Sequence, residues 1–119
     1  NDYDFLKFSN LGYKTSFGNK PYDINYITGS RKKHFVACLV NKTSKIKMKI
    51  FSNQPGLQLY TGHKLNFKSK QKKLSTFQGL CLETQHFPNS PNQKNFPSTL
   101  VLPNKKYRFF TNYKFEKMI

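Results

Sequence analysis

Residues 33–51 read KHFVACLVNKTSKIKMKIF, and this stretch decides the fold. Its first part, Lys33–Val40, is a short run of β-branched, aromatic and aliphatic residues, which is typical of a strand buried on both faces. Its second part, Ser44–Phe51, alternates between apolar side chains and lysines. A period of two with one apolar and one charged face indicates a half-buried antiparallel strand. We therefore predict a β-hairpin that turns at Asn41–Thr43, with its row of lysines protecting an exposed sheet edge.

Further strands are predicted on the C-terminal side of this hairpin. They are Leu57–Thr61, Gly79–Thr84 and Tyr107–Phe115, the last of which alternates again. Asn66–Gln78 is rich in lysine and Phe87–Ser98 contains three prolines, so both segments are predicted to be irregular. Several short strands separated by turn signals, with no amphipathic helix of useful length, indicate an all-β protein built as an antiparallel β-sandwich.

The length and the cysteines set further limits. A chain of 119 residues suffices for one modest core, so we predict a single domain over residues 1–119. No apolar stretch approaches the roughly 20 residues that cross a bilayer, and we predict no membrane partner. Cys38 and Cys81 lie in apolar runs and match no metal or redox spacing. This favours buried free thiols and a reducing, cytoplasmic location, with a single disulfide as the open alternative.

The formal net charge is +16, from 21 basic and five acidic residues. Such an excess attracts nucleic acid or another anionic partner. Only Arg31 and Arg108 are arginines, however, and the point charge of lysine does not match phosphate or guanine as the planar arginine fork does. A general bias toward lysine and asparagine on a solvated surface explains the same count. We rank this explanation first and nucleic-acid binding second.

Glu83 is the main candidate for chemistry. It is one of two glutamates and lies at the end of the apolar run GLCLET, where a carboxylate is costly unless it is paired or used. Composition alone favours a buried structural acid, but the polar residues that follow, Thr84 to His86, favour a functional one. Alternation places His86 on the opposite side of the strand from Glu83, so these two residues do not form an acid/base pair. No nucleotide or metal motif occurs, and we predict no cofactor.

Three segments resemble one family in the same order along the chain. Gly79–Thr99, GLCLETQHFPNSPNQKNFPST, is similar to the signature block near the C-terminus of the aldose 1-epimerases, or galactose mutarotases. Gln54–Gly62, QPGLQLYTG, and Pro21–Tyr26, PYDINY, resemble two further elements of that family. The resemblance runs from about Tyr3 to Phe115. It implies the C-terminal portion of a galactose mutarotase-like supersandwich.

The resemblance also implies a reaction and its residues. The family interconverts the α and β anomers of aldohexoses such as galactose and glucose by general acid/base catalysis. By resemblance, Glu83 is the general base that removes the proton of the C1 hydroxyl, while a histidine protonates the ring oxygen. Asp23 and Gln58 match residues that hydrogen-bond the sugar hydroxyls and orient the ring.

The departures from the family pattern leave other readings open. The family's acid histidine and further sugar-binding residues lie in the N-terminal part of a longer chain, so we assign the acid role to none of His34, His63 and His86. Ile24 and Asn89 stand where the family often has His and Asp. The alternatives are a non-catalytic sugar-binding or structural module, or a basic subunit of a ribonucleoprotein assembly. Open sheet edges predict a second chain or self-association that covers them.

Overall fold

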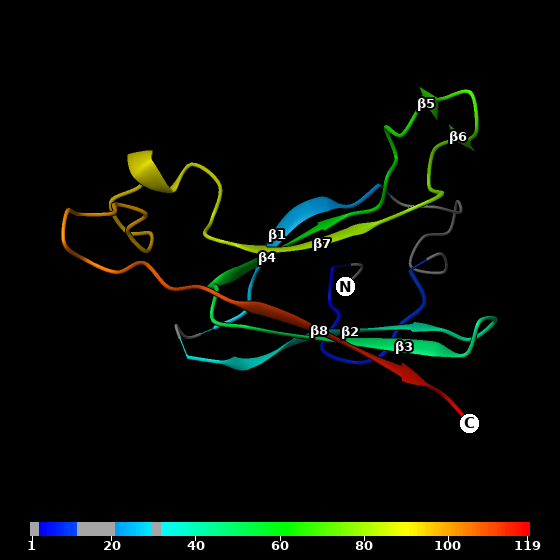
Figure 1. Ribbon diagram of the computed structural model, residues 1–119, viewed down its shortest axis with the longest axis horizontal. Helices are drawn as coiled ribbons and strands as arrows, with labels where there is room; N and C mark the ends of the chain where they lie inside the picture. Colours follow the sequence, from blue (N-terminus) through cyan, green and yellow to red (C-terminus); the bar gives the residue numbers. More distant parts are fainter. Residues whose placement is uncertain (1–2, 12–20, 30–31) are drawn as a thin grey trace. The chain divides into compact units, whose positions relative to one another are not determined.

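The computed structural model of the protein describes residues 3–11, 21–29 and 32–119. These residues form eight β-strands and one short 3₁₀ helix, and they contain no α-helix (Figure 1). In chain order the elements are β1 (Asp23–Ile27), β2 (His34–Asn41), β3 (Ile46–Ser52), β4 (Gly56–Tyr60), β5 (Phe67–Lys68), β6 (Lys73–Leu74), β7 (Cys81–Gln85), η1 (Ser90–Asn92) and β8 (Thr111–Lys117). The predicted all-β, antiparallel fold class is confirmed.

The strands form three sheets, ordered β1-β4-β7, β2-β3-β8 and β5-β6. By contact density the chain divides into two compact units, Asn1–Ile24 with Leu59–Leu82, and Asn25–Gln58 with Glu83–Ile119. The single domain over residues 1–119 stays a prediction. In the described residues no helix is long and apolar enough to cross a membrane.

The hairpin predicted from residues 33–51 is confirmed. Strands β2 and β3 pair antiparallel from His34↔Ser52 to Asn41↔Ile46. The turn is held by Asn41, whose Oδ1 accepts hydrogen bonds from the backbone N–H of Thr43 and of Ser44, each at 3.0 Å. An asparagine that bonds its own turn in this way is a frequent turn former, because the side chain replaces a backbone acceptor.

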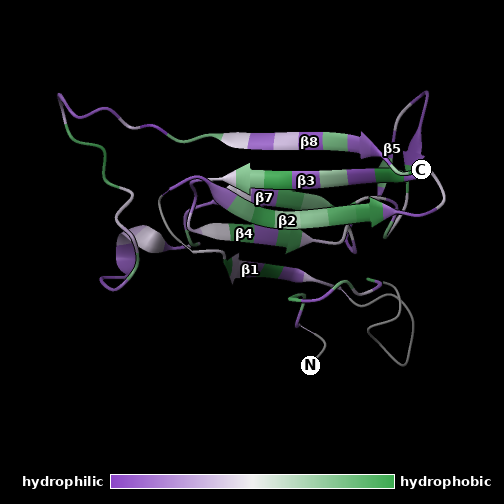
Figure 2. Ribbon diagram, turned by 90° about the horizontal axis from the view of Figure 1, so that it is seen from below, coloured by the Kyte–Doolittle hydropathy of each residue, from purple (hydrophilic) through white to green (hydrophobic). Residues whose placement is uncertain are grey.

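Two details of the hairpin prediction were wrong. Strand β3 is the centre of its sheet, paired with β2 on one side and β8 on the other, so its lysines do not line an edge. Figure 2 shows the alternation of hydrophobic and hydrophilic residues along β3. Strand β2 is mostly half-buried and exposes Phe35, so it is not buried on both faces. Alternation reveals which side of a strand is buried, but it does not reveal which strands lie beside it.

The last strand begins four residues later than predicted, at Thr111 instead of Tyr107. The segment before it is held by a side chain. Asn53 Nδ2 donates to the Arg108 carbonyl at 3.1 Å, and its Oδ1 accepts from the Phe110 N–H at 3.0 Å. Because these two backbone groups are bonded by Asn53, an alternating sequence here forms no ladder.

The remaining predicted strands and irregular segments are confirmed in part. The predicted strands Leu57–Thr61 and Gly79–Thr84 overlap β4 and β7, whereas β1 was not predicted as a strand. Asn66–Gln78 is not wholly irregular, since it includes the β5–β6 hairpin. Phe87–Ser98 contains no strand, only η1.

The cysteines depart from the predicted burial. Cys38 is half-buried and Cys81 is exposed, and both are free thiols. The prediction of a buried Cys81 was wrong because its strand has one exposed side, on which Cys81 and Glu83 both lie.

Candidate functional site

The candidate site is built on β1, β4 and β7, and the register of these strands fixes which side chains are neighbours. The N–H of Thr28 donates to the Pro55 carbonyl at 2.9 Å. The two strands run antiparallel, so the residue three positions before Thr28 on β1 lies opposite the residue three positions after Pro55 on β4. Asn25 therefore lies opposite Gln58, on the same face of the sheet.

Gly56, the first residue of β4, shows which residues of β4 and β7 lie opposite each other. A Cβ added at Gly56 would lie 3.1 Å from the carbonyl oxygen of Gln85, which places these residues opposite each other on β4 and β7. A Cβ added at Gly62 would lie 2.5 Å from the Gly79 carbonyl oxygen, which indicates the same alignment. Two residues along from Gly56, Gln58 faces Glu83. Directly opposed side chains of this kind have Cβ atoms about 5 Å apart.

Asn25, Gln58 and Glu83 thus form one polar row across three strands. The same face is closely packed at Gly56, where an added Cβ would lie 2.7 Å from Asn25 Oδ1 and 3.0 Å from Phe87 Cδ1. A Cβ at Gly56 and the side chain of Gln58 point the same way, since they are two residues apart on one strand. The Phe87 ring therefore lies on the same face as the polar row, next to Gly56.

The polar row lies on the side of β7 that faces away from β8. Thr84, the neighbour of Glu83, points the opposite way, and its Oγ1 is hydrogen-bonded to Oγ1 of Thr111 on β8. Glu83 is exposed. Within residues 3–11, 21–29 and 32–119, the Glu83 carboxylate forms no ion pair and no hydrogen bond. The structure therefore leaves this carboxylate free to act on a ligand.

The other sequence-predicted residues are placed as follows. Asp23 is the first residue of β1 and is exposed, in the unit that contains Leu59–Leu82. Gln58 is half-buried on β4. The structure therefore brings Gln58 and Glu83 together, and it describes Asp23 only within its own unit.

None of the three histidines takes a place in the polar row. His34 Nδ1 lies 2.8 Å from the Lys32 carbonyl oxygen, His63 packs edge-on against Tyr60, and the ring of His86 lies 6.3 Å from that of Tyr107. Each histidine therefore has a local environment of its own. His86 lies just beyond the end of β7, which is Cys81–Gln85, so the prediction that it points to the opposite side from Glu83 stays a prediction.

Sequence reasoning missed the contribution of Asn25 and Gly56. Asn25 Nδ2 is buried, and it has no hydrogen-bond partner among the described residues. The signal for Asn25 was present in PYDINY, where the asparagine follows Asp23 by two residues and so shares its side of the strand. The signal for Gly56 was a glycine inside the block QPGLQLYTG, because a glycine within a strand often marks a close approach of another chain segment.

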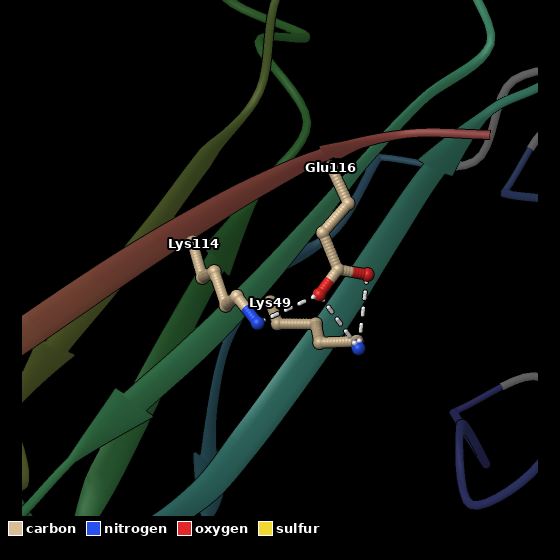
Figure 3. Close-up of polar contacts among 3 residues, drawn as sticks. All are labelled: Lys49, Lys114 and Glu116. Atoms are coloured by element: carbon tan, nitrogen blue, oxygen red, sulfur yellow. Dashed lines mark hydrogen bonds and ion pairs between the residues drawn. The ribbon is translucent and has the colours of Figure 1, made fainter.

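The second glutamate, Glu116, has the opposite environment. Its carboxylate accepts from Lys49 Nζ at 3.0 Å and pairs with Lys114 Nζ at 3.1 Å (Figure 3). Hydrogen bonds from Lys49 and then from Lys114 lower the pKa of Glu116. In the described part of the chain no three His, Cys, Asp or Glu side chains gather as metal ligands.

Comparison with known proteins shows the family to which the sequence belongs. The family profile described as aldose 1-epimerase matches residues 1–114. Human galactose mutarotase is 35% identical over 118 residues, which cover 95% of this chain and 34% of that protein. The chain belongs to the aldose 1-epimerase family. The suspected resemblance is therefore confirmed.

Other relatives show how much of an aldose 1-epimerase the chain represents. Galactose mutarotase of Mus musculus is 37% identical over 98 residues, covering 79% of this chain and 29% of the relative. Aldose 1-epimerase of Escherichia coli is 28% identical over 102 residues, covering 81% of this chain and 30% of the relative. The chain thus spans about a third of the length of its aldose 1-epimerase relatives, and the family match includes Asp23, Gln58 and Glu83.

Proposed function

We propose that this chain supplies the general base and part of the sugar-binding surface of an aldose 1-epimerase. The reaction is the interconversion of the α and β anomers of free aldoses such as galactose and glucose. The observation that carries the proposal is the pairing of Gln58 with an exposed, unpaired Glu83 on one face of the sheet, in a chain of this family.

The chemistry needs one base and one acid. Glu83 accepts the proton of the C1 hydroxyl, and the oxygen's electron pair forms the C1 carbonyl while the bond from C1 to the ring oxygen breaks. The ring oxygen takes up a proton from the acid. Rotation about the bond between C1 and C2, followed by the reverse steps, closes the ring with inverted C1. An exposed carboxylate without an ion pair suits the first step, because no lysine or arginine has to be displaced.

Binding groups fix the sugar relative to the base. Gln58 faces Glu83 across the strand pair, and its amide can donate to one sugar hydroxyl and accept from another. Asp23, which the resemblance assigns to sugar binding, is proposed to hold a further hydroxyl. Orientation of this kind contributes to rate because the reacting oxygen is held within reach of the base.

The acid is proposed to come from outside these 119 residues. His34, His63 and His86 each contact local groups, and the relatives contain about two thirds of their length beyond the matched region. A second chain or a longer polypeptide would bring the acid and cover the open sheet edges. The cytoplasmic location predicted from the cysteines also stays a prediction.

Polarimetry of freshly dissolved α-galactose tests the proposal. The rate of mutarotation is measured with the chain alone, and with the chain mixed with the part of human galactose mutarotase that precedes its matching region. We expect acceleration at least in the mixture. Glu83→Gln should reduce it by about 10²- to 10⁴-fold, because glutamine cannot accept the proton. The matched control is Glu116→Gln, which removes the other glutamate and should leave the rate unchanged.

Two results would contradict the proposal. Equal rates for the wild type and Glu83→Gln would remove Glu83 from the mechanism. Sugar binding without acceleration in either sample would favour the second candidate, a sugar-binding module of the same family that does not catalyse the reaction. The truncated family match is the observation that keeps this second candidate open.

A further inference from the structure

The segment 64–74 carries a dense positive charge with no acidic neighbour in the sequence. Five of its eleven residues are lysines, and none of the five acidic residues of the chain lies between Ile24 and Leu82. All five lysines are exposed, and their ammonium groups form no ion pair with the described residues. They are Lys64, Lys68, Lys70, Lys72 and Lys73. Their charge is therefore available to a partner.

Repulsion between these lysines destabilises the β5–β6 hairpin. Lys68 and Lys73 are directly opposite each other in the β5–β6 hairpin. Like charges in this position destabilise a strand pair, and a hairpin of two-residue strands is marginal by itself. The turn is nevertheless ordered around Ser69, whose N–H donates to the Lys72 carbonyl at 2.8 Å and whose Oγ accepts from the Lys72 N–H at 3.0 Å. An anionic ligand would relieve the repulsion that the hairpin retains.

The other side of the hairpin is apolar and also exposed. Phe67 faces Leu74 in the register, and their side chains are 56% and 38% exposed. Because side chains alternate along a strand, this pair points to the opposite side from Lys68 and Lys73. An exposed aromatic side chain together with lysines on the same hairpin can bind single-stranded nucleic acid, through base stacking and phosphate contacts.

We propose that the β5–β6 hairpin is a binding site for single-stranded nucleic acid. The lysines neutralise successive phosphates, and Phe67 stacks on a base. The two-sided arrangement favours a flexible polyanion over an anionic membrane, because a flat surface reaches one side of the hairpin at a time whereas a flexible strand passes around it. Lysine suffices for this role, since backbone binding without sequence preference rests on charge and counterion release. The inference is independent of the sugar chemistry.

The test is fluorescence anisotropy of a labelled oligouridine of about ten nucleotides, titrated with the 119-residue chain at several salt concentrations. Replacing Lys68, Lys70, Lys72 and Lys73 by Ala should lower the slope of log K against log salt by about 3, at about 0.7 per lost phosphate contact. The control replaces four exposed lysines outside the hairpin, Lys42, Lys94, Lys105 and Lys106, and should change the slope much less. Circular dichroism and thermal melting verify that both variants fold.

Stacking is tested separately from charge. Phe67→Ala should weaken binding by about 5- to 150-fold with no change in slope, whereas Leu74→Ala, which removes an aliphatic neighbour, should change it little. Equal losses for the hairpin and control lysine variants would overturn the proposal in favour of a bulk charge effect. Equal losses for Phe67→Ala and Leu74→Ala would exclude stacking. Binding to phosphatidylserine vesicles without binding to the oligouridine would assign the hairpin to an anionic membrane instead.

Discussion

The two glutamates of the chain lie on strands of different sheets and have opposite surroundings. Glu116 on β8 is held by Lys49 and Lys114 across and along the β2-β3-β8 sheet. Glu83 on β7 is exposed and faces the neutral side chain of Gln58. Of these two glutamates, Glu116 has lysines beside its carboxylate. Glu116 is therefore a carboxylate that stabilises the fold, whereas Glu83 is a carboxylate that the fold leaves without an ion pair among the described residues.

The two sheets that carry these glutamates also differ. The β2-β3-β8 sheet is an antiparallel ladder with one register shift between Phe35 and Ala37, and it has a fully buried side chain, Ile50, on its central strand. The β1-β4-β7 sheet carries the polar row and brings the β4 backbone within van der Waals distance of Asn25 and Phe87 at Gly56. Both sheets bury apolar side chains, since Leu57 and Leu59 of β4 are buried as well, and the β1-β4-β7 sheet differs in also carrying the polar row. The following predictions test this difference.

The largest effect on stability is expected at Ile50. Its side chain is 0% exposed, and its strand is paired on both sides. Ile50→Ala should lower the free energy of unfolding by about 2–5 kcal/mol, through lost burial and the cavity left behind. The control is Ile46→Ala on the same strand, where the side chain is 46% exposed and the loss should be much smaller. Urea denaturation measures both, and equal losses would show that β3 is not the centre of the core.

A smaller effect is expected at Gly56, on the other sheet. An added methyl group would lie 2.7 Å from Asn25 Oδ1 and 3.1 Å from the Gln85 backbone, and a strand backbone yields little. Gly56→Ala should therefore destabilise the protein by about 1–3 kcal/mol, as overpacking does. At Gly79 the nearest atom to an added Cβ is 3.8 Å away, so Gly79→Ala should be neutral or slightly stabilising. If both variants melt with the wild type, the close approach at Gly56 is absent in solution.

The parts of the fold that could be predicted from the sequence are those with a strong local pattern. The hairpin of residues 33–51 was predictable because alternation and turn residues agreed over a long stretch. The start of β8 was not, because Asn53, far away in the sequence, bonds the backbone of residues 108 and 110. The central place of β3 was hidden for a similar reason, since the order of strands in a sheet depends on non-local pairing.

For the candidate site, residue types were predictable and their neighbours were not. Glu83 stood out as a rare carboxylate after an apolar run, and Gln58 entered through the family resemblance. That these two residues oppose each other follows from the register of β4 and β7, which no local pattern contains. The exposure of Glu83 was also missed, because the run GLCLET suggests burial although alternate side chains of β7 face outward. Whether Asp23, Gln58 and Glu83 act on a sugar stays a prediction.

The smallest expected effect concerns the two glutamates themselves. The Lys49 and Lys114 ammonium groups lower the pKa of Glu116 in the folded protein, so the unfolded chain takes up this proton at a higher pH. The pair's contribution to stability is therefore complete above the ordinary glutamate pKa of about 4.3, and it is lost as the pH falls through the lower, folded value. Glu116→Gln should lower the melting temperature slightly at neutral pH and approach the wild type in acid.

Glu83→Gln should behave differently, because an exposed carboxylate without a partner contributes little to folding. Its free energy of unfolding at neutral pH should stay within about 0.5 kcal/mol of the wild type. Thermal melts of the wild type and both variants at neutral pH and near pH 3, at low and high salt, make the measurement. Salt should reduce the Glu116 effect, since its partners are partly solvated. A clear loss of stability in Glu83→Gln, equal to or above that of Glu116→Gln, would mean that Glu83 is a structural acid. The distinction between the two carboxylates would then fail, and with it the physical reason for placing the base on β7.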